Sequence, residues 1–304
     1  MGQLNVLETR TMTLRPPRTR TLVCLPAYNE EKYIGTVVLK ARQFADEVIV
    51  VDDGSTDRTA EVAALAGATV IRHGRNKGYG ASIQTVLSEA KKRDYEVVVI
   101  LDADSQHDPD EIPRFIGPIL KGADLVIGSR AAHKSSIPRY RRIGQWVLSQ
   151  ASRVLSRQKV ADSESGFRAI SRKGIAELEL RQNGFAIETE MIAEAAEKNL
   201  EIAEVPISVS YGKDGSTLNP VVHGLGNLGA IAAMISERRP LFFFGVFGLV
   251  AAVLGIVAGV IVLQAVGAGN EISVGMVSLS VLLLIIGVVS IFTGIILNVL
   301  AKRK

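Results

Sequence analysis

The sequence predicts an α/β protein in which a largely parallel sheet is followed by a C-terminal two-helix transmembrane hairpin. Two observations support this prediction. Short β-branched runs alternate with helical stretches between Thr21 and Ser129, and two long charge-free runs fill the C-terminal part of the 304-residue chain. A chain of this length holds about two domains at roughly 150 residues each, which here are a soluble head and a membrane segment.

Composition excludes several classes of protein. With 47% hydrophobic and 22% charged residues, the chain is not intrinsically disordered. The net charge of +4 is too small for a nucleic-acid-binding surface along the whole chain, so we expect no nucleic-acid partner. A single cysteine, Cys24, excludes an internal disulfide framework and a cysteine-based zinc cluster.

Apolar runs typical of strands alternate with stretches typical of helices. The predicted strands are Thr21–Leu25, Val48–Asp52, Thr69–Arg72, Val97–Asp102 and Leu125–Gly128. The predicted helices are Glu31–Phe44 after an Asn29 cap, Thr59–Ala66 after Asp57, Ala81–Lys92, and Asp110–Ile119 after Pro109. Continuous apolar strands separated by helices indicate a parallel sheet covered on both faces. Ligands of such sheets bind beyond the carboxyl ends of the strands.

The two charge-free runs extend from Leu241 to Asn270 and from Ile272 to Ala301. Each exceeds the roughly 20 residues that a membrane-spanning helix needs. Basic residues flank the pair at both outer ends and only Glu271 lies between the runs, so the positive-inside bias places both ends in the cytoplasm. We therefore expect a multi-pass protein of a cell or ER-type membrane, with its head on the cytoplasmic face. Glycines in both runs permit close helix packing and leave a homo-oligomer open.

These patterns divide the chain into four segments. Residues 1–20 are a basic tail without the apolar stretch of a signal peptide, and we expect the tail to be mobile. Residues 21–219 form the head, residues 220–240 an interfacial amphipathic helix, and residues 241–304 the two transmembrane helices, at about 241–266 and 274–300. A second candidate for an interfacial helix is Ile143–Leu155, which fits a helix packed on the sheet equally well.

The fourth predicted strand ends in Asp102-Ala103-Asp104. Side chains alternate along a strand, so these two carboxylates point the same way and repel each other unless a cation lies near them. A Mg²⁺ or Mn²⁺ ion, with Gln106 as a third oxygen ligand and a phosphate-bearing substrate, would satisfy them. The alternative is an Asp-rich turn that caps the helix after Pro109. His107 is interpreted as a loop histidine rather than a ligand.

Two further loops follow strands. Asp52-Asp53-Gly54-Ser55 is either a turn with capping residues or a place where a carboxylate accepts from a ribose hydroxyl or a base N–H. The glycine-rich stretch from Asn76 to Gly80 opens a helix and suits close approach of the backbone to a ligand. It is neither a Walker loop nor the dinucleotide fingerprint.

Together, in this order and spacing, these elements resemble glycosyltransferase family 2 with its nucleotide-diphospho-sugar-binding GT-A fold. The matching motifs are Pro26-Ala27-Tyr28-Asn29-Glu30, Val51–Asp57, Asn76-Lys77-Gly78, Asp102-Ala103-Asp104, Gly128-Ser129-Arg130 and Asp162–Arg168. The last two, with a C-terminal membrane hairpin, are similar to the polyprenyl-phosphate branch: the dolichol-phosphate mannose synthases and their glucosyl relatives. The resemblance covers Thr21 to about Tyr211.

The resemblance implies roles for individual residues. Those implied to bind the nucleotide sugar are Pro26, Tyr28, Glu30, Asp52, Asp53, Lys77, Gly78 and Asp102. Those implied to hold a Mg²⁺ or Mn²⁺ cofactor are Asp102, Asp104 and Gln106. Arg130, Arg141 and Arg142 fall where related synthases bind the acceptor phosphate. The implied catalytic residues are Asp104, Arg130 and Asp162.

The implied activity is inverting, metal-dependent transfer of a hexose to a membrane polyprenyl or dolichyl phosphate, for glycan or glycoprotein assembly. UDP-glucose, UDP-N-acetylglucosamine and GDP-mannose are the candidate donors. Thr217, in the stretch Lys213–Thr217, replaces a lysine of many mannose synthases, so the sugar stays open. One alternative is a membrane-anchored family 2 transferase that acts on a polysaccharide or glycolipid, and another is a non-catalytic nucleotide-sugar-binding module. The charge-free spans argue against a transporter.

Overall fold

Two compact units make up the chain in the computed structural model, one of residues 1–137 with 161–216 and the other of residues 138–160 with 217–304. The structure describes residues 19–130, 160–208, 220–269, 271 and 273–301. Several predicted features lie outside these residues: most of the basic tail, Arg141, Arg142, the segment Ile143–Leu155, Lys213 and Thr217.

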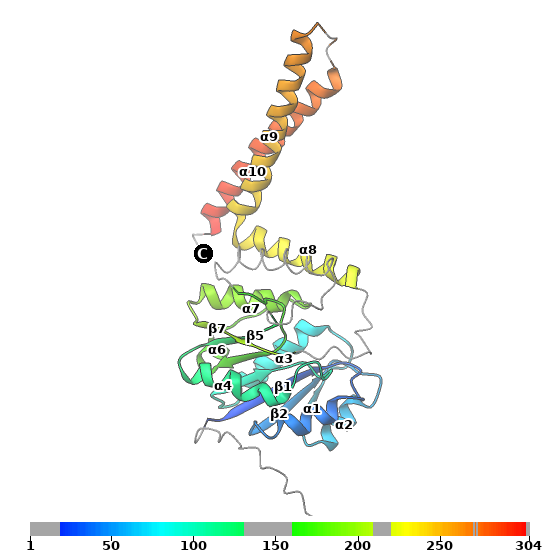
Figure 1. Cartoon of the computed structure of the whole chain (residues 1–304), viewed down its shortest axis with the longest axis vertical. Coiled ribbons are helices and arrows are strands. Elements are labelled where there is room, and N and C mark those ends of the chain that lie inside the picture. Colours follow the sequence, from blue (N-terminus) through cyan, green and yellow to red (C-terminus); the bar gives the residue numbers. More distant parts are fainter. Residues whose placement is uncertain (1–18, 131–159, 209–219, 270, 272, 302–304) are drawn as a thin grey trace, which may run out of the picture. The chain divides into compact units, whose positions relative to one another are not determined.

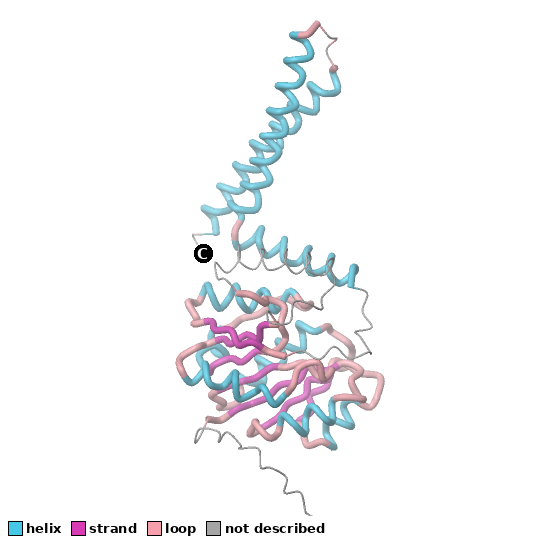
Figure 2. The backbone as a smooth tube through the Cα atoms, viewed as in Figure 1, coloured by secondary structure: helices cyan, strands magenta, loops and turns pink. Residues whose placement is uncertain are grey.

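A seven-stranded sheet forms the centre of the first unit (Figures 1 and 2). Its strand order is β3-β2-β1-β4-β6-β5-β7. Strand β6 runs antiparallel to β4 and β5, and the other neighbouring pairs are parallel, so the predicted largely parallel sheet is confirmed. The strands are β1 (Thr21–Ala27), β2 (Glu47–Asp52), β3 (Thr69–Arg72), β4 (Val97–Ile100), β5 (Leu125–Ser129), β6 (Arg168–Ser171) and β7 (Ile202–Pro206).

Helices cover both faces of this sheet, as the continuous apolar strands predict. The helices are α1 (Ile34–Ala41), α2 (Thr59–Leu65), α3 (Tyr79–Lys91), α4 (Ile112–Leu120), α6 (Arg172–Glu177) and α7 (Ala186–Glu197), with a 3₁₀ turn at Pro109–Glu111. Buried residues of α1, α2 and α4 share one cluster with alternate residues of β1, β2 and β4. The buried positions of α3 pack on the opposite face, and α6 and α7 contact α3.

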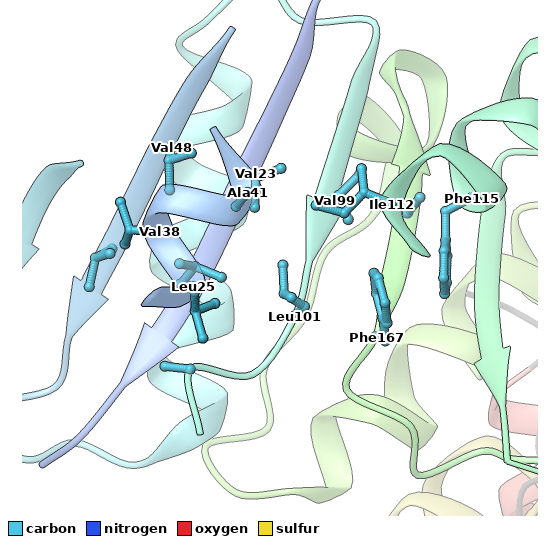
Figure 3. Close-up of a cluster of buried hydrophobic side chains, with 14 of the residues drawn as sticks. Val23, Leu25, Val38, Ala41, Val48, Val99, Leu101, Ile112, Phe115 and Phe167 are labelled. Atoms are coloured by element: carbon cyan, nitrogen blue, oxygen red, sulfur yellow. The ribbon is translucent and has the colours of Figure 1, made fainter. Parts of the chain in front are cut away.

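Alternate side chains of β1 and β4 point to the same face of the sheet and enter one core. Val23, Leu25 and Val99 point into the cluster with α1 and α4, where Phe115 stacks on Phe167 with ring centroids 4.0 Å apart (Figure 3). Strands that are apolar on both faces bury a row of side chains in each layer. This burial supports the sheet whose carboxyl edge, the edge at which the parallel strands end, carries the polar loops.

Two sequence expectations at strand and helix ends are wrong. Strand β4 ends at Ile100, so Asp102 lies in the loop after the strand and strand alternation does not orient its side chain. Helix α1 begins at Ile34 rather than Glu31, and Asn29 does not cap it. Asn29 instead has a φ of 56°, and its Oδ1 accepts a 2.9 Å hydrogen bond from the Thr56 amide. That bond joins the loops that follow β1 and β2.

The second unit contains three helices among its described residues: α8 (Pro220–Arg238), α9 (Pro240–Gly267) and α10 (Val274–Ala301). Helices α9 and α10 are each 28 residues long and contain 18-residue windows with mean hydropathies of 2.9 and 2.8, so both are long and apolar enough to cross a membrane. They pack on each other through small residues. The Ser280 hydroxyl donates to the Gly255 carbonyl at 2.7 Å.

Candidate active site

The loop after β4 carries the acidic pair at the carboxyl edge. Ser105, with a φ of 64°, turns this loop back on itself. The Asp104 carboxylate accepts the Gln106 amide N–H at 2.9 Å and the Gln106 side-chain nitrogen at 2.7 Å. The side-chain oxygen of Gln106 therefore faces away from Asp104, and a metal role for Gln106 needs its amide to rotate.

Negative charge accumulates around this loop. Burial raises the pKa of Asp102 to about 6, although Arg130 and Arg168 oppose the shift. Burial also raises the pKa of Glu30 to about 7, and the charges of Asp104 and Asp102 add to the rise. The pKa of Asp104 is raised by burial and by Asp102. Neighbouring carboxylates whose negative charge raises the pKa of Asp104 and Glu30 create a local demand for a cation.

His107 lies beside the pair. It is 5% exposed, and its Nδ1 is 3.6 Å from Asp102 Oδ2, too long for a hydrogen bond. Burial lowers the pKa of His107 to about 4, so the ring is neutral at physiological pH. A neutral ring packed near Phe167, with centroids 5.4 Å apart, fits the predicted loop histidine. The structure nevertheless places it at the site.

Asp52, the last residue of β2, and Asp53, which follows it, accept hydrogen bonds from main-chain amides. Asp52 is fully buried, accepts the Ser55 amide at 2.9 Å and forms a 3.0 Å ion pair with Arg72. Asp53 accepts the amides of Lys77 and Gly78, the latter at 2.8 Å, and lies 2.7 Å from His73 Nδ1. Asp53 thus shapes the Lys77–Gly78 loop, and its predicted contact with the nucleotide stays a prediction.

Glycine is required in that loop. Gly78 has a φ of 93°, and a Cβ there would lie 2.9 Å from the Asn183 carbonyl oxygen. Gly80 donates its amide to the same carbonyl at 2.9 Å, and a Cβ at Gly80 would lie 2.3 Å from the Gln182 carbonyl oxygen. The predicted close backbone approach is therefore made, within the described residues, to another segment of the chain.

Arg130 and Asp162 are two predicted site residues that lie 32 positions apart in the sequence, and they form a bidentate ion pair. The Nε and Nη2 atoms of Arg130 each donate to the Asp162 carboxylate at 2.6 Å, and the Arg130 amide donates to it at 3.1 Å. Burial alone would raise the pKa of Asp162, but the hydrogen bonds and charge of Arg130 hold it below its usual range. The pair fixes the plane of the guanidinium at the end of β5.

The remaining predicted residues lie at the end of β1. Pro26 is buried within the strand, whereas Tyr28 is 45% exposed and Glu30 is half-buried. The electrostatic coupling of Glu30 to Asp102 and Asp104 brings this loop to the acidic pair. The structure thus assembles the predicted residues of β1, the β4 loop and β5 around one edge.

Three polar residues of the site were not predicted. Arg168 is 2% exposed, Glu188 is 6% exposed, and the Tyr79 hydroxyl donates to the Glu188 carboxylate at 3.1 Å. Burial raises the pKa of Glu188 to about 8, against the opposing charge of Arg168. Arg168 is the last residue of the Asp162–Arg168 motif, so the sequence could have indicated it as a site residue. Glu188 had none, because helix α7 itself was not predicted.

The residues present fit a divalent cation only in combination with a phosphate ligand. Among the residues that the structure describes, three or more His, Cys, Asp or Glu side chains nowhere converge as a protein-only metal site requires. A Mg²⁺ or Mn²⁺ ion held by one or two carboxylates completes its shell with water and substrate phosphates. The acidic pair provides that kind of donor set.

A mostly parallel sheet with helices on both faces and an acidic loop at its carboxyl edge defines a GT-A-like protein. A crystal structure of glucosyl-3-phosphoglycerate synthase from M. tuberculosis has this fold, with a TM-score of 0.58 and 25% identity over 72% of this chain and 81% of that chain. The model of glycosyl transferase family 2 matches residues 22–178, and the chain belongs to this family.

Three curated relatives match between 62% and 71% of the chain. This chain is 33% identical to the UDP-N-acetylglucosamine–dolichyl-phosphate N-acetylglucosaminyltransferase of Methanococcus voltae, over 62% of this chain and 84% of the relative. It is 31% identical to a dolichyl-phosphate hexose transferase of Haloferax volcanii, over 71% and 94%. It is 32% identical to the polyprenol monophosphomannose synthase of Mycolicibacterium smegmatis, over 64% and 79%.

Proposed function

We propose that this protein transfers a hexose from a nucleoside-diphosphate sugar to a polyprenyl phosphate in the membrane, with inversion at the anomeric carbon. The observation that carries the proposal is the acidic pair Asp102 and Asp104 at one strand edge, with Asp102 in electrostatic contact with Arg130. The names of the relatives, which act on dolichyl and polyprenyl phosphates, support the acceptor. Helices α9 and α10 fit a lipid substrate.

The donor side of the proposal uses the loops after β1, β2 and β4. Asp102 and Asp104 would hold a Mg²⁺ or Mn²⁺ ion at the diphosphate, with Gln106 beside them. When bound, the ion supplies positive charge to the nucleoside diphosphate as it leaves. Tyr28 and Glu30 would line the nucleotide pocket. Asp52 would act through the turn at Ser55, and Asp53 would act through the Lys77–Gly78 loop, because each accepts main-chain amides of that segment.

The acceptor side uses Arg130. A phosphate monoester has its second pKa near 6, so at neutral pH it already presents an anionic oxygen and needs no strong general base. An arginine with a fixed guanidinium plane suits that oxygen, and Asp162 fixes the plane through two 2.6 Å hydrogen bonds. Arg141 and Arg142 would add phosphate contacts. A single displacement on an α-linked donor gives a β-linked product.

The transferred sugar and the topology complete the proposal. The relatives differ in the sugar that their names specify, so each of three donors is tested. We further propose that α8 lies at the membrane interface, that α9 and α10 span the bilayer, and that the head faces the cytoplasm. The basic residues at both outer ends of the hairpin support that orientation.

The test is a transfer assay with the detergent-solubilised full chain. Polyprenyl phosphate and Mg²⁺ or Mn²⁺ are incubated with labelled UDP-glucose, UDP-N-acetylglucosamine or GDP-mannose, and label in the organic extract is counted. One donor should label the lipid. EDTA or Asp104→Ala should reduce the rate by about a hundredfold or more, because developing charge on the leaving group is no longer neutralised.

Asp110→Ala is the matched control, because Asp110 is an exposed acidic residue a short way along the same segment. It should transfer at the wild-type rate. Protein that binds a nucleotide sugar but labels no lipid with any donor would contradict the acceptor assignment. A polysaccharide or glycolipid acceptor, or a non-catalytic binding role, would then take its place.

A further inference from the structure

The Asp102 carboxylate rests directly on Gly166. A Cβ atom at residue 166 would lie 2.6 Å from Asp102 Oδ2 and 2.8 Å from Oδ1, closer than side chains pack. The carboxylate therefore occupies the space that a side chain at residue 166 would need. The place of one of the two acidic groups thus depends on a turn more than sixty residues further along the chain.

The residue after Gly166 anchors this turn in the core. Phe167 is fully buried and stacks on Phe115 with ring centroids 4.0 Å apart (Figure 3). Its carbonyl accepts the Gly128 amide at 2.9 Å, which ties the turn to β5. Gly166 cannot retreat from Asp102 without moving a large aromatic side chain in a close-packed interior.

Arg168 clamps the other side of the turn. Its Nε donates to the Ser165 carbonyl at 2.8 Å, its Nη2 to the Ser163 carbonyl at 2.9 Å, and its Nη1 to the Glu188 carbonyl at 2.7 Å. All three are main-chain acceptors, two in the turn and one in the first turn of α7. The planar fork of an arginine meets three such acceptors at once, which the single ammonium of a lysine does not.

We propose that Gly166 and Arg168 are positioning residues that set the place of the Asp102 carboxylate, and through it the affinity for the sugar donor. This rests on the proposed function, in which Asp102 contacts the donor diphosphate. Neither residue contacts the acceptor in the proposal. Their loss should therefore change donor kinetics more than acceptor kinetics.

The first test is Gly166→Ala in the full chain. The added methyl group displaces the Asp102 carboxylate. Misplacement of a reacting group by about an ångström costs up to a hundredfold. We expect kcat/KM for the donor to fall between about tenfold and a hundredfold, the nucleotide-sugar Kd to rise, and the acceptor KM to stay within about twofold of wild type.

Gly174→Ala is the matched control. A Cβ at Gly174 would lie 2.7 Å from the Asp124 carbonyl oxygen and 2.8 Å from Ile170, an overlap of the same size. Gly174 follows β6 at the opposite end from Gly166 and far from the acidic pair. This variant should lose thermal stability without the selective change in donor kinetics.

Arg168→Lys tests the clamp with its positive charge retained. It should also raise the donor Kd, and the double variant Gly166→Ala/Arg168→Lys should lose less than the sum of the two single effects, because both act on one turn. Additive effects would contradict a shared positioning role, as would equal changes in donor and acceptor kinetics.

A crystal structure of Gly166→Ala separates failure of the inference from failure of the proposed function. If wild-type protein binds no nucleotide sugar, the proposed function fails, yet the structure still tests the positioning role. An Asp102 carboxylate moved away from residue 166 supports that role. A carboxylate that stays 3.6 Å from His107 Nδ1 overturns it.

Discussion

Glu188 shows how a single buried residue couples the site to pH. Its side chain is 6% exposed and accepts the Tyr79 hydroxyl at 3.1 Å. Burial, with the charges of Asp102 and Glu164, raises its pKa to about 8 against the opposing charges of Arg168 and Arg130. The folded protein therefore keeps this carboxyl protonated at neutral pH, whereas the unfolded chain ionises it near pH 4.5.

We predict that Glu188→Gln makes the protein less sensitive to pH. Between about pH 4.5 and pH 8 the folded state of the wild type binds more protons at this site than the unfolded state, so its stability falls as pH rises. Glutamine keeps the acceptor for Tyr79 and cannot ionise. The variant should match the wild type at pH 5 and exceed its Tm at pH 8 by several degrees, at roughly 2–4 °C per kcal/mol.

Thermal unfolding of the full chain in one detergent at pH 5, 6, 7 and 8 checks this. Glu197→Gln, a change of a glutamate at the end of the same helix, is the control and should follow the wild-type profile. A variant whose Tm declines with pH in parallel with the wild type would show that Glu188 is already ionised in the folded protein.

At the scale of elements, the site depends on loops that hold one another. Asp53, at the end of β2, is 3% exposed and accepts two amides of the loop before α3. Gly80 in turn is tied to the segment before α7 through Asn183. One carboxylate thus organises a loop that the sequence indicates as ligand-binding.

We predict that Asp53→Ala weakens donor binding together with stability. The Lys77 amide loses its acceptor and the Gly78 amide keeps only Asn76 Oδ1, at 3.1 Å, which costs roughly 1–3 kcal/mol in the free energy of unfolding. The freed loop should raise the nucleotide-sugar Kd several-fold, as measured by calorimetry. Asp46→Ala is the control, since Asp46 accepts the Thr21 amide at the opposite end of β1. It should lower stability and spare donor binding.

The packing of α9 against α10 depends on glycines at the contact between the two helices. A Cβ at Gly248 would lie 2.6 Å from the Gly287 carbonyl oxygen, whereas a Cβ at Gly245 meets only a Leu241 methyl group at 4.0 Å. The two glycines are three residues apart on one helix. Close backbone approach at small residues is how helices associate in lipid.

We predict that Gly248→Leu separates the hairpin and that Gly245→Leu does not. The first substitution places four carbons where another backbone lies, and the second places them in open space at the helix surface. Thermal unfolding in detergent should show a clear loss for Gly248→Leu alone. Equal melting curves for the two variants would rule out this packing in the membrane protein.

At the scale of the whole molecule, we predict that the head and the segment between α9 and α10 lie on opposite sides of the membrane. Cys24 is fully buried, so the wild-type chain offers a background that thiol reagents do not label. Glu271 lies between α9 and α10, and Lys121 is exposed at the end of α4 in the head. Single cysteines at these two places report on the two proposed sides.

We predict that Glu271→Cys reacts with a membrane-impermeant maleimide in intact cells, and that Lys121→Cys reacts only after permeabilisation. This follows from a hairpin whose basic outer ends stay in the cytoplasm. Labelling of Lys121→Cys in intact cells would place the head outside, and labelling of both positions would in addition show that the hairpin does not cross the bilayer. Labelling of neither before permeabilisation would indicate a hairpin that does not cross the bilayer.

Local pattern in the sequence determined the strands β1 to β5, the helices between them and the two apolar C-terminal helices, because burial on one or both faces imposes a period that a single segment displays. It also located the acidic pair, since its carboxylates follow an apolar strand. Strand β6 was not predicted, because both of its end residues, the buried Arg168 and Ser171, are polar and leave only two apolar residues between them.

Only the tertiary structure decided which residues meet. The Arg130–Asp162 pair, the Gly166–Asp102 contact and the Arg168 clamp join segments that no short-range pattern connects. Asp53, interpreted from the sequence as a turn or a ligand contact, takes its partners from a loop more than twenty residues away. Periodicity in the sequence reflects the average environment of one face of an element. A hydrogen bond or a close contact depends instead on the positions of separate loops in space, and those positions depend on the packing of the whole sheet.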